Sequence, residues 1–295
     1  LIVIGSDFPY HDFYPDNDIP TIQIDNKADQ IGRRHIVSNP LPGDAKLTLT
    51  ELLPLVSKSE TGAFLKKSQE DMQKWIKEQD KFENSSDVPL RPQTLASTIS
   101  KFANEDAIIC CDTGAVTVWG ARNFKLRGSQ RFTLSANLAS MGFGLPAAIG
   151  AQLAFPDRQV IALCGDGGFA MLMGDFVTAV KYNLPIKIFI FNNGKLGLIQ
   201  MEEEARSGNP EYQTDLLNPD YAAYAEICGG EGFTIKEPYE LESVIKSALK
   251  SSRPCIINSF VNPDELTMPP KVSFSDAVNY GKAKIKEFFI RHKSK

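Results

Sequence analysis

The chain has 295 residues, of which 42% are apolar and 23% charged, which is the balance of a soluble globular protein with one large or two ordinary domains. A net charge of −4 gives no reason to expect nucleic-acid binding, and no apolar run approaches the roughly 20 residues that span a bilayer. The five cysteines are odd in number and form no CxxC or Cys/His spacing, which indicates buried, reduced thiols in a cytoplasmic protein.

Residues 1–58 have the pattern of the end of an α/β domain. The chain begins without a methionine, and Leu1–Ile4 already reads as an apolar strand, so we expect a fragment or a chain whose N-terminal part is absent. Pro20–Asp25 is a second expected strand, and Thr48–Val56 is a short helix with an apolar stripe. Residues 59–90 are mostly polar, and the helical spacing of their few apolar residues predicts a surface helix followed by a linker.

Residues 91–266 alternate between helices and continuous apolar strands. The expected strands are Ala107–Cys111, Gln130–Leu134, Val160–Cys164, Ile186–Phe191, Phe233–Ile235 and Pro254–Val261. The expected helices lie near 93–104, 114–122, 145–154, 174–183, 218–228 and 238–250. This pattern predicts an α/β fold with a doubly wound parallel sheet that is covered by helices on both faces. In such sheets ligands bind at the carboxyl ends of the strands, so we expect the site there.

The C-terminal residues 267–295 form a separate, basic tail. From Lys271 onwards seven Lys/Arg stand against two acids, a net charge of +5, so the rest of the chain is near −9. The apolar residues Val278, Ile285, Phe288 and Phe289 fall on roughly one helical face with lysines around it. A basic amphipathic helix of this kind can lie on an anionic membrane surface. The alternative is a helix that packs on its own domain with its lysines in solvent.

Two expected strand ends carry polar, glycine-rich sequences. Strand Val160–Cys164 is followed by Gly165-Asp-Gly-Gly168, and strand Ile186–Phe191 is followed by Asn192-Asn-Gly194. Glycines let a backbone approach a phosphate closely, and the amides of the following helix can face an anion. Asp166 offers a carboxylate and Asn193 an amide oxygen, which are ligands suited to Mg²⁺. The sequence GDGG alone is also common as a simple turn. Followed by NN, with a helix and a strand between them, it is a far more specific signal of a diphosphate–metal site.

This pair resembles the thiamine-diphosphate (ThDP) binding signature of thiamine enzymes, and the flank Ser135–Gly150 is similar too. The resemblance implies that Met141 is the apolar wedge beneath ThDP, although a lone Met would more often be core. It implies that Ala139, Ser140 and Met141 line the pyrimidine, and that Asp112-Thr-Gly114 begins the first loop. It also implies that a second set of residues binds the diphosphate: Asp166, Gly167, Gly168, Asn193, Gly194, Lys195, Leu196, Gly197, Leu198 and Ile199. The implied metal ligands are Asp166, Asn193 and the backbone carbonyl of Lys195.

Nearly the whole chain resembles the C-terminal half of bacterial pyruvate oxidases, particularly the quinone-reducing kind. Gly5–Pro15 and Ile22–Asp25 are similar to the flavin-binding end of their central domain, which implies that residues 1–58 are the C-terminal part of a central FAD-binding domain. The implied FAD contacts are Ser6, Asp7, Phe8, Pro9, Tyr10 and Asp25. Without the resemblance, Asp25 reads either as a ribose ligand or as a helix N-cap. Gly43-Asp44 resembles a further stretch near the flavin.

Acetolactate synthase, which shares the fold and these cofactors, is the alternative. It usually carries a Trp a few residues beyond its NN motif, and Leu198–Arg206 contains none. The oxidases have an aromatic residue in place of Leu198 and a Glu where Glu202 stands; they have His and Gly in place of Leu138 and Ala139. Two further alternatives are a catalytically dead phosphate-binding scaffold and a flavodoxin-like module. The presence of both Asp166 and Asn193 argues against the scaffold, and a flavodoxin-like module has no need of the GDG and NN pair.

The resemblance implies oxidative decarboxylation of pyruvate to acetate and carbon dioxide with ThDP, Mg²⁺ and FAD. Electrons would pass to a quinone or to oxygen, and phosphate would replace water in the oxygen-using relatives. Met141, Leu198 and Glu202 are the implied catalytic residues. The family's proton-relay glutamate lies in an N-terminal domain that no part of this chain matches, so we expect the chain alone to be inactive. We also expect a dimer or tetramer, and peripheral contact with the inner face of the cell membrane.

Overall fold

The computed structural model describes residues 1–8, 11–57, 62–267 and 272–293, with the exception of the side chains of residues 12 and 291–293. Pro9 and Tyr10, two of the predicted FAD contacts, therefore lie outside the described residues. The chain divides into two compact units, Leu1–Met72 and Gln73–Lys295. The boundary falls inside the stretch 59–90 that the sequence predicts as a helix and linker.

The first unit contains a small parallel sheet of three strands. Strands β1 (Ile2–Ile4), β2 (Ile22–Asp25) and β3 (Asn39–Pro42) lie in that order, and helix α1 (Ala45–Leu52) follows. Strand β3 was not predicted, because its Asn-Pro-Leu-Pro sequence has two residues without a backbone N–H; such a strand is tolerated at a sheet edge. Helix α1 begins earlier than predicted because Asp44 caps it: the Asp44 Oδ1 atom accepts a hydrogen bond from the Leu47 amide at 2.9 Å.

Helix α2 (Ala63–Glu83) is long and almost entirely exposed, and the boundary between the two units falls within it. Its last residue, Glu83, is buried and anchors this end to the second unit. The Glu83 carboxylate accepts hydrogen bonds from Lys125 Nζ at 2.6 Å and from Asn123 Nδ2 at 3.1 Å. Three helical turns complete the N-terminal part of the chain: His11–Phe13, Ala28–Gln30 and Leu53–Leu55.

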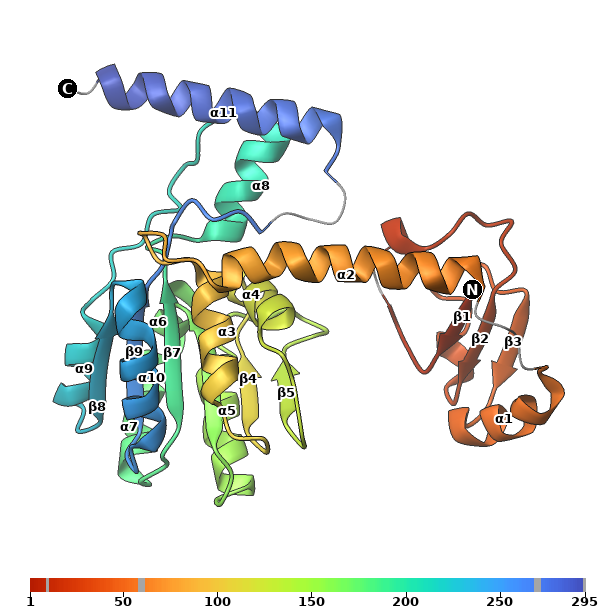
Figure 1. Cartoon of the computed structure of the whole chain (residues 1–295), viewed down its shortest axis with the longest axis horizontal. Helices are drawn as coiled ribbons and strands as arrows, with labels where there is room; N and C mark the ends of the chain where they lie inside the picture. Colours follow the sequence, from red (N-terminus) through yellow and green to blue (C-terminus); the bar gives the residue numbers. More distant parts are fainter. Residues whose placement is uncertain (9–10, 58–61, 268–271, 294–295) are drawn as a thin grey trace. The chain divides into compact units, whose positions relative to one another are not determined.

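The second unit is built on a parallel sheet of six strands in the order β5-β4-β6-β7-β9-β8, so the predicted fold class is confirmed (Figure 1). The strands are β4 (Ile108–Cys111), β5 (Arg131–Leu134), β6 (Val160–Gly165), β7 (Lys187–Asn192), β8 (Glu231–Ile235) and β9 (Cys255–Phe260). Each lies within two residues of its predicted bounds. Strands β6, β7 and β9 are buried almost throughout, which explains their continuous apolar sequences.

Helices cover both faces of this sheet because alternate strand residues point to opposite sides. Ile109 and Cys111 join a core with α3 (Pro92–Phe102), α4 (Ala115–Asn123) and α10 (Leu241–Lys250). Ile108 and Cys110 join a second core with α5 (Gly144–Ala154), α6 (Asp166–Leu172), α7 (Phe176–Lys181) and α9 (Tyr221–Ile227). Each fully buried Leu or Ile in these cores contributes roughly 1.5–3 kcal/mol of transfer free energy.

The strand order reverses between β4 and β6. The chain goes from β4 outward to β5 on one side and then returns to β6 on the other, which places a topological switch point between β4 and β6. At such a point the loops that follow the two strands diverge and leave room for a ligand at their carboxyl ends. Asp112 directly follows β4, and Asp166 directly follows β6. The topology therefore brings these two acids to one edge of the sheet.

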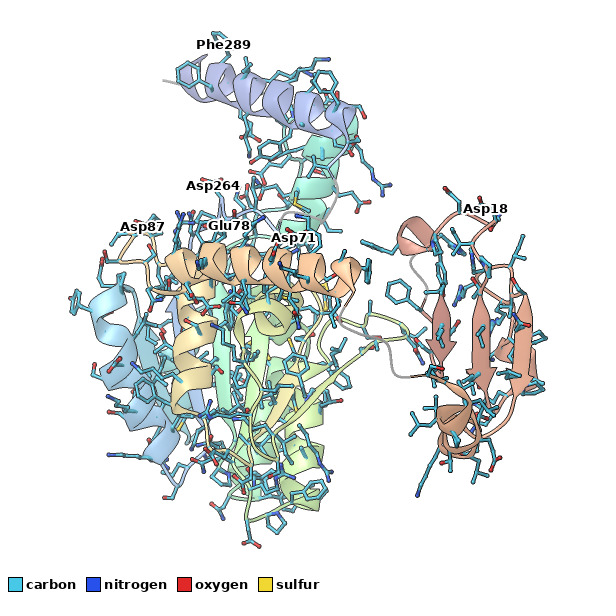
Figure 2. All side chains as sticks on the ribbon, turned by 45° about the vertical axis from the view of Figure 1, so that its right-hand side comes forward. Asp18, Asp71, Glu78, Asp87, Asp264 and Phe289 are labelled. Carbon is cyan, nitrogen blue, oxygen red and sulfur yellow. The ribbon has the colours of Figure 1, made fainter. Side chains whose placement is uncertain are left out.

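Helices α8 (Gly197–Ser207) and α11 (Phe274–Lys293) pack against each other outside the sheet (Figure 1). Ala283 is fully buried in this contact, and Asn279 Nδ2 donates to the Arg206 carbonyl at 3.1 Å. The other face of α11 exposes the predicted apolar residues, for example Ile285 (60%) and Phe289 (59%), and Figure 2 shows Phe289 near the end of the helix. The tail thus packs on its own domain and also presents an apolar face. In the part of the chain that the structure describes, no helix is both long and apolar enough to cross a bilayer.

Candidate cofactor and metal site

A cavity of about 280 Å³ lies at the carboxyl ends of the strands in the second unit. Its walls come from the loops after β4, β6, β7 and β9 and from helices α8 and α11. The structure brings most of the predicted site residues together there: Ala139, Met141, Asp166, Gly167, Gly168, Asn193, Lys195, Leu196, Gly197, Leu198 and Ile199. Three predicted residues, Ser140, Gly194 and Glu202, are not part of the cavity lining.

Asp166 links the end of β6 to the turn that follows β7. Its side chain is almost fully buried, and its Oδ2 atom accepts hydrogen bonds from the Gly194 amide at 2.8 Å and from Asn218 Nδ2 at 2.6 Å. Burial raises the pKa of this carboxyl even though these hydrogen bonds oppose the rise. A buried carboxylate without a cationic partner is costly, and a bound cation at this position would offset that cost.

The turn after β7 contacts Asp166 through the backbone amide of Gly194. Gly194 has a φ of +68°, a left-handed conformation that favours glycine. The Asn193 Oδ1 atom accepts a hydrogen bond from the Lys195 amide at 3.2 Å, which fixes the amide side chain beside the turn. Among the described residues no three His, Cys, Asp or Glu side chains gather as a metal site. A metal here would therefore take mixed oxygen donors, as Mg²⁺ commonly does.

The two glycines after Asp166 lie in tight contact with their surroundings. A Cβ atom on Gly168 would come within 2.6 Å of the Asp112 Oδ2 atom, and one on Gly167 would come within 3.1 Å of Leu196 and of Leu216. Gly168 has no room for a side chain beside Asp112, and the backbone of both residues stays open towards the cavity. This open backbone is what a closely bound phosphate requires.

Asp112 fixes the loop that carries Met141. It is fully buried, and its Oδ1 atom accepts hydrogen bonds from the amides of Thr113, Gly142 and Phe143 at 2.7, 2.8 and 3.2 Å. Burial raises the pKa of this carboxyl, and its Oδ2 atom has no hydrogen-bond partner among the residues that the structure describes. Because Gly142 directly follows Met141, the carboxylate sets the position from which Met141 reaches the cavity.

Ala139, two residues before Met141, adopts a strained backbone conformation. Its φ of +47° lies in the left-handed region, which a residue with a Cβ atom adopts only at a cost. Two hydrogen bonds hold the turn: the Ala139 amide donates to the Ser135 carbonyl at 2.9 Å, and the Ser140 amide donates to the Ser135 hydroxyl at 3.1 Å. The glycine that the resembled oxidases have in place of Ala139 would adopt this conformation without strain.

Helix α8 places Glu204 in the cavity wall, whereas the glutamate predicted to be catalytic is Glu202. Glu202 pairs with Arg206 at 2.7 Å on the outer face, so its proposed catalytic role stays a prediction. Glu204 is almost fully buried in the cavity wall and accepts hydrogen bonds from Gln200 Nε2 at 3.0 Å and from Lys284 Nζ at 2.8 Å. Burial raises the pKa of Glu204. Its partner Lys284 is 80 residues away, so sequence reasoning had no signal for this pair.

The predicted FAD residues of the first unit are held by local contacts. Asp7 forms a two-pronged ion pair with Arg34 at 2.8 and 3.1 Å, and this guanidinium keeps the pKa of Asp7 below its usual range. Phe8 packs edge-on to Tyr14 with ring centroids 5.8 Å apart. Asp25 is buried, and its Oδ1 atom accepts from the Lys27 amide at 2.9 Å, so one of its oxygens caps a turn.

Comparison with known proteins identifies the family of this site. Residues 112–259 match the family model described as "Thiamine pyrophosphate enzyme, C-terminal TPP binding domain". A Bacillus subtilis (strain 168) protein, YdaP, whose name describes it as thiamine pyrophosphate-containing, is 42% identical over 99% of this chain and 50% of its own length.

Two enzymes of known type are similar at lower identity. The acetolactate synthase large subunit of Porphyra purpurea is 30% identical over 84% of this chain and 42% of its own length. The pyruvate oxidase of Lactiplantibacillus plantarum is 28% identical over 100% of this chain and 49% of its own length. The chain spans about half the length of the curated relatives it matches. On the family match and the 42% identity, the chain belongs to the thiamine pyrophosphate enzyme family.

Proposed function

We propose that this chain is the C-terminal half of a pyruvate oxidase that uses ThDP, Mg²⁺ and FAD. The observation that carries the proposal is the meeting of Asp166, the Asn193–Gly194 turn and Met141 at one cavity on the switch point of the sheet. The donor set fits a magnesium–diphosphate group, because it combines one buried carboxylate, an amide oxygen, a nearby backbone carbonyl and two open glycines. ThDP would supply the nucleophilic carbon and the electron sink for decarboxylation of a 2-oxo acid, and FAD would take the electrons.

The residues of this chain would bind, orient and shield. Asp166, Asn193 and the Lys195 carbonyl would hold the metal, while Gly167 and Gly168, which have no side chains, would let the diphosphate approach the backbone closely. Met141 is held in place because the amides of Gly142 and Phe143 donate to the Asp112 carboxylate, and it would support the cofactor from below with an adaptable apolar side chain. The cavity is lined on one side by apolar residues of α8, Leu198 and Ile199, which would limit water around the reacting carbon.

Acetolactate synthase is the second candidate, because synthases are as similar to this chain as the oxidase is. The absence of Trp from 198–206 and the stretch Gly5–Pro15 favour the oxidase. The deciding experiment uses the full-length protein with FAD, ThDP and Mg²⁺. Flavin absorbance is followed under anaerobic pyruvate, and the flavin is then reoxidised with oxygen or a menaquinone analogue. Bleaching followed by rapid reoxidation supports the oxidase, whereas acetolactate formation without bleaching selects the synthase.

We further propose that the site is completed by a second subunit and by an N-terminal domain. Helices α6 and α7 expose Met171 (57%) and Val177 (50%), which supports a partner surface on this face of the sheet. The 295 residues alone should then bind the cofactor weakly and show no pyruvate decarboxylation. Measurable turnover by this chain on its own would contradict the proposal.

The exposed face of α11 supports a peripheral membrane contact that would bring the protein to a lipid-borne quinone. Deletion of residues 275–295 should abolish lipid binding and quinone turnover but not the reduction of a soluble dye. Because α11 also supplies Lys284 to the cavity wall, a sharper variant is Ile285→Ser with Phe289→Ser, which changes only exposed positions. If this variant still pellets with anionic vesicles as the wild type does, the membrane contact is wrong.

A further inference from the structure

The loop that carries two of the predicted metal ligands is held by a second segment of the chain. Residues 208–220, here called the strap, run from the end of α8 to the start of α9. The Leu196 amide donates to the Thr214 carbonyl at 2.9 Å, and the Leu216 amide donates to the Gly194 carbonyl at 2.8 Å. Lys195 and Asp215 form an antiparallel bridge between these two bonds. The loop 193–197 and the strap therefore pair like two short strands.

An ion pair between nearly buried side chains reinforces this pairing. Lys195 Nζ contacts the Glu211 carboxylate, and only 13% and 14% of the two side chains are exposed. The Thr214 hydroxyl donates to Glu211 Oε2 at 2.5 Å. Burial alone would raise the pKa of Glu211, but the bonds from Lys195 and Thr214 hold it below its usual range. The Lys195 side chain is thus committed to the strap, and Lys195 is also one of the residues that line the cavity.

The strap also reaches the other predicted metal ligand. Asn218 Nδ2 donates to Asp166 Oδ2 at 2.6 Å and to Asn192 Oδ1 at 3.1 Å. Leu216 of the strap and Leu196 of the loop both lie close to the position that a Cβ atom on Gly167 would occupy, each at 3.1 Å. A displacement of the strap would therefore move both halves of the predicted metal site together.

We propose that Lys195 and Glu211 are a positioning pair, here called the latch, that holds the strap against the loop 193–197. The latch would thereby set how tightly Mg²⁺ and the diphosphate are bound. This inference rests on the proposed use of the loop as a metal–diphosphate site. Removing the Lys195 charge leaves Glu211 nearly buried without its ion-pair partner, and removing the Glu211 charge leaves Lys195 beside the exposed carboxylate of Asp215 at 3.8 Å; either change destabilises the closed loop. The Lys195 side chain pairs with Glu211, which is not part of the cavity lining, so the pair acts through the backbone of residues 193–197.

The test is a double-mutant cycle in the full-length protein. The variants are Lys195→Met, Glu211→Gln and both together, and ThDP binding at a series of Mg²⁺ concentrations is followed by the fluorescence of Trp119, which lines the cavity. Each single variant should weaken the Mg²⁺-dependent affinity about tenfold, a coupling of about 1.4 kcal/mol, and the double variant should lose no more than a single one. Wild-type affinity in either single variant, or additive losses, would overturn the latch.

Two further variants separate a positioning role from a general loss of structure. Lys195→Arg keeps the charge and should retain near wild-type affinity, so a loss as large as that of Lys195→Met would refute the ionic latch. Neutralising the exposed pair Lys101–Glu242, which lies outside the cavity lining, should leave ThDP affinity unchanged. If the wild type itself binds no ThDP, the proposed function fails; if it binds and the latch variants bind equally well, only the latch fails.

Discussion

Two neighbouring glycines should differ in how strongly the same substitution destabilises the protein. In Gly168→Ala the new Cβ atom would lie 2.6 Å from Asp112 Oδ2, and Asp112 is buried and held by three backbone amides. Overpacking of this kind costs about 1–3 kcal/mol, and weakening the amide bonds to Asp112 costs about 1 kcal/mol more. The better helix propensity of Ala returns about 1 kcal/mol, which leaves a net destabilisation of about 1–3 kcal/mol.

Gly167→Ala is the matched control in the same helix. Its Cβ atom would meet the ends of the Leu196 and Leu216 side chains at 3.1 Å and of the Met141 side chain at 3.6 Å, and these flexible ends can move. The packing cost and the propensity gain should nearly cancel, so stability should stay within about 1 kcal/mol of the wild type. Thermal unfolding without added ThDP measures the difference, with a shift of about 2–4 °C per kcal/mol. A Gly168→Ala protein as stable as Gly167→Ala would refute the close packing of Asp112 against the glycine turn.

Three other outcomes are expected. Ala139→Gly should raise the free energy of unfolding by up to about 1 kcal/mol, because relief of the strained φ outweighs the entropic cost of the more flexible unfolded chain. Chemical denaturation measures this change, and a clear loss of stability would contradict it. Lys187→Met should cost about 1–3 kcal/mol, because Lys187 Nζ donates to the Ser251 and Arg253 carbonyls. Burial lowers the pKa of Lys187 below the ordinary 10.5. The contribution of this ionisation to stability therefore grows as the pH rises towards 10.5 and is lost as the pH falls through the folded pKa. Denaturation at several pH values should show the wild type gaining stability relative to Lys187→Met as the pH rises, and a constant difference would contradict the burial effect.

Much of the second unit could be predicted because its strands are buried on both faces. A strand such as β7 is apolar along its whole length, and no surface helix has that pattern. Helix 174–183 was predicted as one element, but it begins at Phe176 and is preceded by the separate helix α6. Helix α8 was not predicted as an element, because its charged sequence gains stability chiefly from packing against α11, far away in the chain.

The same reasoning explains which parts of the site were predictable. Asp166 and Asn193 each follow an obvious strand, so the parallel sheet alone brings them to one edge. Glu204 and Glu211 depend on Lys284 and Lys195, partners that the chain brings close only after folding. Glutamates on an exposed-looking helix or loop carry no sequence signal of such a pairing. The sequence periodicity therefore predicted which edge of the sheet carries the site, but not the glutamate–lysine pairs that lie beside it.

Asp166 and Asn193 are the residues proposed to hold a divalent ion against a diphosphate. The most direct measurement is calorimetric titration of ThDP into the full-length protein with and without Mg²⁺, for the wild type and Asp166→Asn. Asp157→Asn, at an exposed acid just before β6, is the control. The wild type and the control should bind ThDP only with Mg²⁺, and Asp166→Asn should lose about 3 kcal/mol, a more than hundredfold weaker affinity. Equal affinity of Asp166→Asn and the wild type in Mg²⁺, or binding by the wild type that is independent of the metal, would contradict the claim.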